Sequence, residues 1–225
     1  MTISIIEQIV RIFAPHLCVG CGAEEDKLLC RACRTALLPV PSRCYRCKAA
    51  TERYKVCLDC ARHTPLEQVV VGAQYQGLAQ ELVHHMKYER AQAGIHEIAD
   101  LLAPLLSNLP EGVVVTSVPT ATSRVRARGY DHARLLARAL SRLGTLPCQT
   151  LLMRMGQAHQ VGASRAERLK QLQGTLRPIH AERIRGRHIV LIDDVLTTGA
   201  TLETAARALK RAGAQSVGAL VFAEA

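Results

Sequence analysis

The chain has 225 residues, of which 48% are hydrophobic and only 3% aromatic, with no tryptophan. This length suits one α/β domain of average size plus a small module, and the scarcity of aromatic residues argues against nucleic-acid recognition by stacking. The net charge of +10 favours an anionic partner, which is a phosphorylated small molecule, nucleic acid or an acidic protein. No secretory signal and no apolar stretch of membrane-spanning length is recognisable, so we expect a cytoplasmic protein without a membrane span.

Cysteine pairs dominate the N-terminal part of the chain. Residues 3–13 first place apolar side chains at helical spacing, which predicts a short amphipathic helix. Eight of the nine cysteines then form four C-x-x-C pairs: Cys18/Cys21, Cys30/Cys33, Cys44/Cys47 and Cys57/Cys60. Each pair can present two thiolates to a tetrahedral Zn²⁺, so eight ligands predict two structural zinc ions. The ninth, Cys148, is expected to be buried as a small hydrophobic residue.

The pairing of the cysteines and the role of the surrounding charge are left open by the spacing. Short loops favour sequential pairing, in which each half of the segment is its own zinc ribbon, and crossed pairing is the alternative. Arginines and lysines between the cysteines indicate either a nucleic-acid or partner surface, or a solvated face. We place the domain boundary near Thr64-Pro65, so that 1–64 holds the helix and a double zinc ribbon, and 65–225 is a separate α/β domain.

The first half of that domain alternates strand and helix patterns. A strand at 69–71 precedes helices over 77–87 and 91–106, and a β-branched run at 113–118 predicts another buried strand. Lys87 lies on the first helix, where it either reaches a pyrophosphate or is simply solvated.

Hydroxyl groups and alternating arginines follow the strand at 113–118. Ligands bind at the carboxyl ends of strands in parallel sheets, and guanidinium groups bind phosphate oxygens, so Arg124, Arg126 and Arg128 predict a phosphate site. A basic exposed loop is the alternative. A helix over 131–143 follows, with Asp131 as its N-cap.

A polar, basic segment separates a short strand at 151–153 from the last part of the chain. It runs from Arg154 to Gly174, includes Gln160 and Arg165, and has no apolar period. Such a segment inside a compact domain is typical of a mobile lid, and disorder without function is the alternative.

The stretch Val190 to Leu202, which reads V-L-I-D-D-V-L-T-T-G-A-T-L, predicts a buried strand that leads into an anion-binding turn. Asp193 and Asp194 at the strand end are suited to accept hydrogen bonds from vicinal hydroxyls or to hold Mg²⁺ through water. The turn offers backbone N–H groups and hydroxyls before a helix N-terminus through Thr197, Thr198, Gly199, Ala200 and Thr201. A helix over 202–212 and a strand at 217–222 complete the pattern, which predicts a doubly wound parallel sheet.

This stretch resembles the ribose-phosphate motif of type I phosphoribosyltransferases. Together with the cysteine pairs and the run V-P-T-A-T-S-R-V-R-A-R-G-Y-D, it makes the chain similar to the ComF family. The resemblance implies that Asp193 and Asp194 hold the ribose hydroxyls in catalysis and that 197–201 hold the 5-phosphate. It further implies that the arginines bind pyrophosphate, that 154–170 form the lid, and that Mg²⁺ accompanies phosphoribosyl pyrophosphate. Thr197 stands where hypoxanthine–guanine enzymes have an aspartate, which disfavours a 6-oxopurine substrate.

The family resemblance implies a cytoplasmic protein that is needed for uptake of transforming single-stranded DNA, with DNA and competence proteins as candidate partners. Three hypotheses follow. The chain is an active phosphoribosyltransferase with an undefined nucleophile, a non-catalytic sugar-phosphate sensor that works through DNA or a partner, or a zinc-ribbon nucleic-acid module with an inert α/β companion. The intact pairing of two carboxylates with the turn argues against the third.

Overall fold

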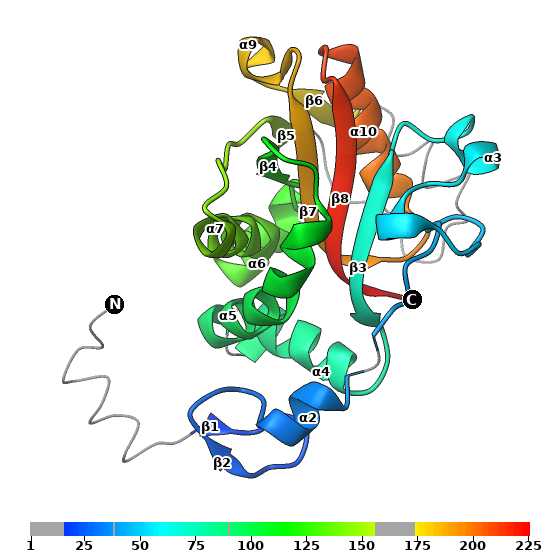
Figure 1. The fold of residues 1–225 in the computed structure, drawn as a ribbon. Coiled ribbons are helices and arrows are strands. Elements are labelled where there is room, and N and C mark those ends of the chain that lie inside the picture. Colours follow the sequence, from blue (N-terminus) through cyan, green and yellow to red (C-terminus); the bar gives the residue numbers. More distant parts are fainter. Residues whose placement is uncertain (1–15, 38, 90, 156–173) are drawn as a thin grey trace.

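A four-stranded parallel sheet is the centre of the fold in the computed structural model, which describes residues 16–37, 39–89, 91–155 and 174–225 (Figure 1). The predicted N-terminal helix and the predicted lid residues Gln160 and Arg165 lie outside this part of the chain. In spatial order the strands are β3 (Gln68–Gln74), β8 (Ser216–Glu224), β7 (His188–Leu196) and β4 (Val114–Ser117). All neighbouring strands are parallel. Strand β8, which follows the other three in the sequence, lies between β3 and β7.

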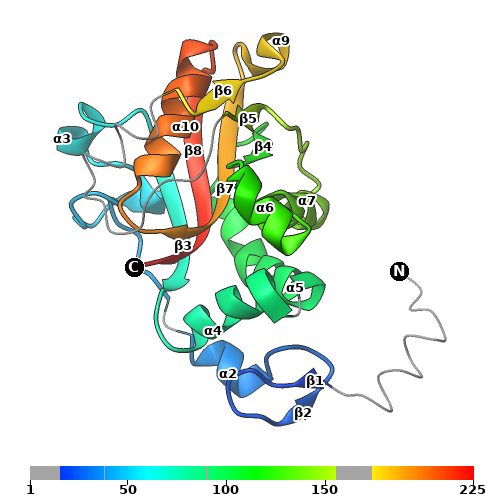
Figure 2. The same ribbon diagram turned by 180° about the vertical axis from the view of Figure 1, so that it is seen from behind.

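Helices cover both faces of the sheet, which confirms the doubly wound arrangement. Alternate residues of β7 enter different cores, because successive side chains of a strand point to opposite faces. Val190 and Ile192 pack in one core with three helices, whereas Ile189 and Leu191 pack in the other with a single helix seen in front of the sheet in Figure 2. The three helices are α4 (Leu78–His84), α5 (Ala91–Leu102) and α7 (His132–Gly144), and the single helix is α10 (Ala200–Arg211).

Several helix ends differ from their predicted positions. Helix α4 is followed by a π-helical turn, η2 (His85–Glu89), and α5 by a 3-10 helix, η3 (Ala103–Asn108). The second change coincides with Pro104 in the first turn of η3, where the missing N–H ends regular α-helical hydrogen bonding.

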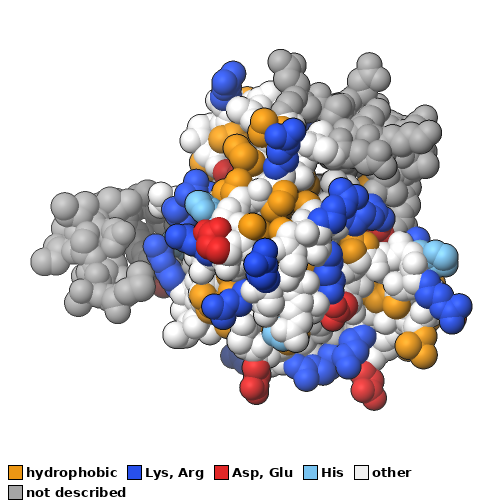
Figure 3. Space-filling model, turned by 90° about the horizontal axis from the view of Figure 1, so that it is seen from above, with side chains coloured by type: hydrophobic (Ala, Val, Ile, Leu, Met, Phe, Trp, Pro, Cys, Tyr) orange, Lys and Arg blue, Asp and Glu red, His pale blue; other side chains and the backbone are white. Residues whose placement is uncertain are grey.

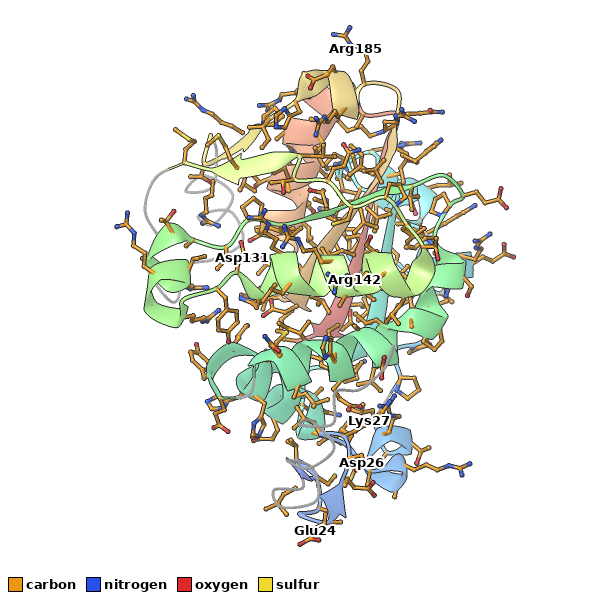
Figure 4. The ribbon with its side chains drawn as sticks, turned by 90° about the vertical axis from the view of Figure 1, so that its left-hand side faces the viewer. Glu24, Asp26, Lys27, Asp131, Arg142 and Arg185 are labelled. Atoms are coloured by element: carbon orange, nitrogen blue, oxygen red, sulfur yellow. The ribbon has the colours of Figure 1, made fainter. Side chains whose placement is uncertain are left out.

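The arginine-rich run after β4 is a helix rather than a loop. Helix α6 (Thr122–Arg128) ends at Gly129, whose φ of 82° provides the left-handed cap. Asp131 then caps α7 as predicted, with its Oδ1 accepting a hydrogen bond from the backbone N–H of Arg134 at 3.3 Å. Figure 4 shows Asp131 at the start of α7 and Arg142 near its other end.

The segment after α7 runs outside the parallel sheet. Strand β5 (Leu152–Arg154) pairs antiparallel with β6 (Leu176–Pro178), and α9 (Ala181–Ile184) leads into β7. Cys148 is exposed, so the prediction that it is buried is wrong. Cys148 lies where the chain passes along the edge of β4, and there the N–H of Val115 donates to the carbonyl of Pro147 at 2.8 Å. Cys148 is exposed because the edge of a sheet leaves one side of the chain uncovered.

The cysteine-rich segment forms two lobes on different sides of the molecule (Figure 1). The first cysteine lobe, residues 16–37, lies beside α4, and the second cysteine lobe, residues 39–64, lies beside β3. The first contains β1 (His16–Leu17), β2 (Glu24–Glu25) and α2 (Arg31–Thr35); the second contains η1 (Glu52–Tyr54) and α3 (Leu58–Ala61). The division at residue 64 stays a prediction, because each lobe packs separately on the α/β part.

Ion pairs with buried glutamates hold both lobes in place. Arg34 of the first lobe pairs with Glu97, which is 3% exposed, on α5. Arg43 and Lys48 of the second lobe pair with Glu224, which is 2% exposed, at the end of β8. These cations therefore dock the lobes. Arg34 and Arg43 are partly buried in these pairs, whereas 45% of the Lys48 side chain stays exposed.

A weaker pair adds to the docking of the first lobe. Lys27 Nζ lies 2.9 Å from Asp100 Oδ2 of α5, and Figure 4 shows Lys27 between the first lobe and that helix. Within the described ranges, no helix is long and apolar enough to cross a membrane.

Candidate functional site

The two predicted phosphate-binding segments meet at one edge of the sheet. β4 and β7 are parallel neighbours, so their carboxyl ends lie side by side. The N–H of Val118, just after β4, donates to the carbonyl of Ile192 in β7 at 3.0 Å. The turn before α6 and the turn before α10 are thereby brought to the same place.

Strand β7 extends further than the apolar run suggests. It continues through both carboxylates to Leu196, so Asp193 and Asp194 lie within the strand and point to opposite faces. Asp193 lines a pocket with the following turn, whereas Asp194 faces the helices of the opposite side. The pocket is lined by Asp193, Val195, Leu196, Thr197, Thr198, Gly199, Ala200, Thr201 and Leu202.

The turn before α10 has the geometry of an anion site. Gly199 is the N-cap residue, with φ of 76°, and it has no side chain that could cap the helix. Thr198 Oγ1 accepts a weak hydrogen bond of 3.4 Å from Ala200 N. The N-terminus of a twelve-residue helix thus faces the pocket, and its dipole and N–H groups favour a phosphate.

Asp194 is buried and contacts the side chains of Lys87 and His132. Its Oδ2 lies 3.2 Å from Nε2 of His132 and pairs with Nζ of Lys87, while its Oδ1 accepts from Val195 N at 2.8 Å. Burial alone would raise the pKa of Asp194, but the hydrogen bond from His132 and the charge of Lys87 outweigh it and bring the pKa well below its ordinary value. Asp194 is therefore an ionised carboxylate whose charge is compensated within the protein.

Asp193 behaves in the opposite way. Burial raises its pKa above the ordinary value, and the negative charge of Asp194 raises it further. Its Oδ1 accepts a hydrogen bond from Asp194 N at 3.0 Å, and its side chain is partly exposed to the pocket. The adjacent carboxylates thus differ both in direction and in the ease with which they ionise.

Lys87 is placed by the π-helical turn η2. Tyr130 donates a hydrogen bond from its hydroxyl to the carbonyl of Met86 at 2.7 Å, which ties this turn to the start of α7. A Cβ added to Gly94 of α5 would lie only 2.7 Å from Met86 Cα, so the absence of a side chain there allows the turn to approach α5. The predicted pyrophosphate contact of Lys87 remains a prediction, since the lysine is paired with Asp194.

The three arginines of α6 have different surroundings. Arg128 hydrogen bonds to His132 Nδ1 and to the hydroxyl of Tyr88, each at 3.0 Å, and its guanidinium carbon lies 4.8 Å from the centre of the Tyr88 ring. Because a guanidinium only donates, His132 carries its ring proton on Nε2 and donates it to Asp194. Arg124 and Arg126 are exposed, so the run is not gathered into a single cluster.

Arg154 lies close to the pocket. Burial lowers the pKa of its guanidinium, the nearby charge of Arg124 lowers it further, and the charge of Asp193 acts in the opposite direction. Two guanidinium groups and the pocket carboxylate are therefore electrostatic neighbours. Gln160 and Arg165, which were predicted to share the lid role of Arg154, lie outside the described residues.

The cysteines form two groups of four with sequential pairing. Cys18, Cys21, Cys30 and Cys33 make one group, and Cys44, Cys47, Cys57 and Cys60 make the other, with all ligand atoms of a group within 4.8 Å of one another. The Sγ distances of 3.8 Å for Cys21–Cys30 and 3.5 Å for Cys47–Cys57 agree with the edge of about 3.8 Å of a tetrahedron of sulfurs around zinc.

The local electrostatics of each group also suits a metal. Burial raises the pKa of Cys18 and of Cys44, but backbone hydrogen bonds outweigh it and lower both pKa values to about 6. One thiol of each group is thus prepared as the thiolate that Zn²⁺ requires. The donor sets fit two structural zinc ions, and sequential pairing is the arrangement that the structure has.

Comparisons with known proteins agree with this fold. A family model for the phosphoribosyl transferase domain matches residues 126–225. The DNA utilization protein YhgH of Escherichia coli K12 is 30% identical over 210 residues, which cover 84% of this chain and 87% of that protein. Competence protein ComFC of Bacillus subtilis is 27% identical over 200 residues, covering 84% and 81% of the two chains. Competence protein F of Haemophilus influenzae is 26% identical over 203 residues, covering 84% and 87%.

The parallel sheet and the turn before α10 define a protein of the type I phosphoribosyltransferase class, with two cysteine groups that could bind zinc. The match to YhgH, which extends over most of both chains, then identifies the family within this class. The chain belongs to the ComF family, and the predicted family is confirmed.

Several residues around the site carry no signal of their own in the sequence. His132 sits one position after the predicted N-cap of α7, and only its contact with Asp194 reveals its place. Tyr88 and Tyr45 are ordinary aromatic residues until the fold brings them against Arg128 and Gly199.

Proposed function

We propose that the pocket beside β7 binds phosphoribosyl pyrophosphate or a related ribose 5-phosphate. The supporting observation is that one carboxylate, Asp193, and the uncapped N-terminus of α10 line the same pocket. The helix N-terminus favours the phosphate, and the carboxylate accepts hydrogen bonds from the vicinal hydroxyls of the ribose. A ligand with a phosphate at one end and a diol near it satisfies both.

The other predicted residues surround this arrangement. The turn 197–201 takes the 5-phosphate, and Asp193 receives the ribose hydroxyls directly. Asp194 supports that contact from behind, where it holds Lys87 and His132. Arg154 is an electrostatic neighbour of both Arg124 and Asp193, and we assign the pyrophosphate to this region. Arg128 supports His132, and Arg126 is given no contact with the ligand.

The associated reaction is displacement of pyrophosphate from the anomeric carbon of the sugar. The bond from that carbon to the pyrophosphate oxygen breaks, and its electron pair leaves with the pyrophosphate. A bond to the incoming nucleophile forms, and the nucleophile gives up its proton to water. Mg²⁺, when bound with the substrate, would neutralise charge on the pyrophosphate. The arginines add to that neutralisation, and the ribose contacts of Asp193 orient the reacting carbon.

A non-catalytic sugar-phosphate sensor is the second candidate. Among the residues that line the described pocket, Asp193 is the one titratable group, and the proposal already uses it for the ribose. A binding protein needs no general base, so this composition favours a sensor as much as an enzyme.

Calorimetry with phosphoribosyl pyrophosphate and Mg²⁺ tests the pocket. We expect the wild type to bind, and Asp193→Asn to bind at least about tenfold more weakly, because a carboxyl oxygen that accepts from the ribose hydroxyls is replaced by an amide N–H₂ group that only donates. Glu111→Gln, at an exposed position before β4, is the matched control and should bind like the wild type. Absence of binding by the wild type would refute the proposal. Release of pyrophosphate with any of a panel of nucleobases and amines would separate an enzyme from a sensor.

We also propose a role in DNA uptake or use during natural competence, with a cytoplasmic location. Support comes from the names of the relatives and from the end of the sheet at which the strands begin, where Figure 3 shows lysine and arginine side chains spread over the surface. The exposed arginines of this end are Arg177, Arg183, Arg185, Arg187 and Arg211. Figure 4 shows Arg185 pointing away from the molecule there.

Electrostatic binding of single-stranded DNA predicts a steep dependence on salt. We expect the affinity for an oligonucleotide to fall by more than about tenfold between 50 and 200 mM salt, because bound phosphates release counterions. The double variant Arg185→Glu, Arg187→Glu should weaken binding and flatten the salt dependence. Binding that is absent or independent of salt would remove direct DNA contact from the proposal.

A further inference from the structure

The second cysteine lobe touches the phosphate-binding turn through the two residues between its first pair of cysteines. Tyr45 and Arg46 separate Cys44 from Cys47 in the sequence. A Cβ added to Gly199 would lie 2.9 Å from Cε2 of Tyr45, so the aromatic ring packs directly against the N-cap of α10. This ring is 5% exposed, and it forms the outer support of the turn that lines the pocket.

A buried carboxylate in the first turn of α10 completes the contact. Glu203 is 1% exposed, and its Oε1 accepts from the Tyr45 hydroxyl at 2.7 Å and lies 3.3 Å from Nη1 of Arg46. Its Oε2 lies 3.2 Å from Nη2 of Arg207 on the next turn. An uncompensated negative charge here would oppose an anion at the helix N-terminus, and Arg46 and Arg207 compensate it.

The conformation that presents these two residues depends on the cysteines. The N–H of Lys48 donates to the carbonyl of Cys44 at 2.9 Å, and the N–H of Cys44 donates to the carbonyl of Ala49 at 2.8 Å, which closes a tight turn around Tyr45 and Arg46. Four thiol groups are held within 4.8 Å of one another at this turn. Thiolates at that spacing repel one another without a metal, so metal binding and the shape of the turn are coupled.

The first cysteine lobe provides an internal comparison. It packs on α4 and α5 through Leu28, Leu29 and Arg34, and its two leucines belong to the core on the face of the sheet opposite to α10. Both lobes have the same ligand chemistry and similar ion-pair docking. The second lobe places the Tyr45 ring directly against Gly199 of the pocket wall.

We propose that the second cysteine group, through Tyr45 and Arg46, positions the phosphate-binding turn, so that loss of metal from this group weakens sugar-phosphate binding and loss of metal from the first group does not. Tyr45 is a positioning residue in this scheme, because it acts on the ligand through Gly199 and Glu203. The inference rests on the proposed function of the pocket and assigns it a metal-dependent regulation.

Matched cysteine variants test the proposal. Cys47→Ser and Cys21→Ser each remove the exposed second cysteine of the first C-x-x-C pair in its group. We expect each variant to retain about one zinc ion per chain by metal analysis. In calorimetry with ribose 5-phosphate, Cys47→Ser should raise Kd about tenfold or more, whereas Cys21→Ser should stay within about twofold of the wild type. Equal affinities of the two variants would overturn the proposal.

Substitutions at Tyr45 test the positioning role without removing a metal ligand. Tyr45→Ala removes the ring that supports Gly199 and should weaken ribose 5-phosphate binding with both zinc ions retained. Tyr45→Phe keeps the ring and removes only the hydroxyl, so it should restore most of the affinity. An alanine variant that binds like the wild type would contradict the positioning role.

Hydrogen exchange separates this inference from the proposed function. Backbone amides of the turn 197–201 should exchange faster in Cys47→Ser than in the wild type, and at the wild-type rate in Cys21→Ser. If the wild type binds no sugar phosphate, the proposed function fails, but the exchange rates still show whether the lobe holds the turn. Unchanged exchange in Cys47→Ser would overturn the coupling itself.

Discussion

At the scale of single residues, Asp193 and Asp194 are neighbours in sequence with different tasks. Asp194 is ionised and enclosed by Lys87 and His132, and Asp193 faces the pocket with a raised pKa. The sequence identifies both carboxylates as candidate ribose ligands, but it cannot divide their roles, because the division depends on the length of β7 and on side chains from η2 and α7.

Stability measurements should distinguish the two carboxylates. Asp194→Asn leaves the half-buried Lys87 without its ion pair, so we expect a loss of about 3 kcal/mol in the free energy of unfolding. Asp193→Asn removes a group whose ionisation is opposed by its surroundings, so stability should be unchanged or higher. Urea unfolding at neutral pH measures both. Equal losses would show that the two side chains share one environment.

Their pH dependences should also be opposite. The folded pKa of Asp194 is lowered, so its stabilising contribution is present above its ordinary pKa of 3.8 and is lost as the pH falls below that value. The folded pKa of Asp193 is raised, so stability falls as the pH rises from 3.8 through the raised value. Asp194→Asn should therefore flatten the acid loss, and Asp193→Asn the decline at higher pH. Unfolding measured between about pH 3 and 8 checks this, and identical profiles for the two variants would contradict it.

At the scale of elements, the buried strands were predictable and the helix ends were not. Runs of Val, Ile and Leu mark β3, β4, β7 and β8, because strands covered on both faces need apolar residues at every position. The π-helical turn η2 was missed, since it depends on the fit of Met86 against Gly94 rather than on a local pattern. The helical state of α6 was also missed. Its three arginines form no apolar pattern that would predict a helix, and Gly129 at its end is compatible with a loop as well.

Gly94→Ala tests the contact that shapes η2. An alanine in an exposed helix normally stabilises by about 1 kcal/mol relative to glycine. Here the added Cβ would lie 2.7 Å from Met86 Cα, so we expect a loss of about 1–3 kcal/mol and a displaced Lys87. Thermal and urea unfolding give the sign directly. A stabilised variant would mean that the turn and α5 are not in close contact.

At the scale of the whole molecule, the two cysteine lobes are separate attachments to one α/β body. The sequence predicted their ligands and favoured the sequential pairing without excluding the crossed one, because the spacing of the cysteines is local. It could not predict where the lobes dock, since Glu97, Glu203 and Glu224 lie far along the chain and read as ordinary charged residues.

Matched glutamate variants should release one lobe at a time. Glu97→Gln leaves Arg34 without its buried partner, and Glu224→Gln does the same to Arg43 and Lys48, each at a cost of about 3 kcal/mol. Limited proteolysis should then cut first within 16–37 in Glu97→Gln and within 39–64 in Glu224→Gln. The same cleavage pattern in both variants would show that the lobes are not docked independently.

The order of the strands has a consequence for synthesis on the ribosome. Strand β8, residues 216–224, lies between β3 and β7, and β3 has no other neighbour among the described strands of this sheet. The sheet therefore cannot close until residues 216–224 have left the exit tunnel. The cysteine groups, which need only local sequence, emerge first and can acquire metal long before Glu203 and Glu224 are translated. Newly made chains could therefore bind zinc at both cysteine groups before the residues that form the pocket have been made.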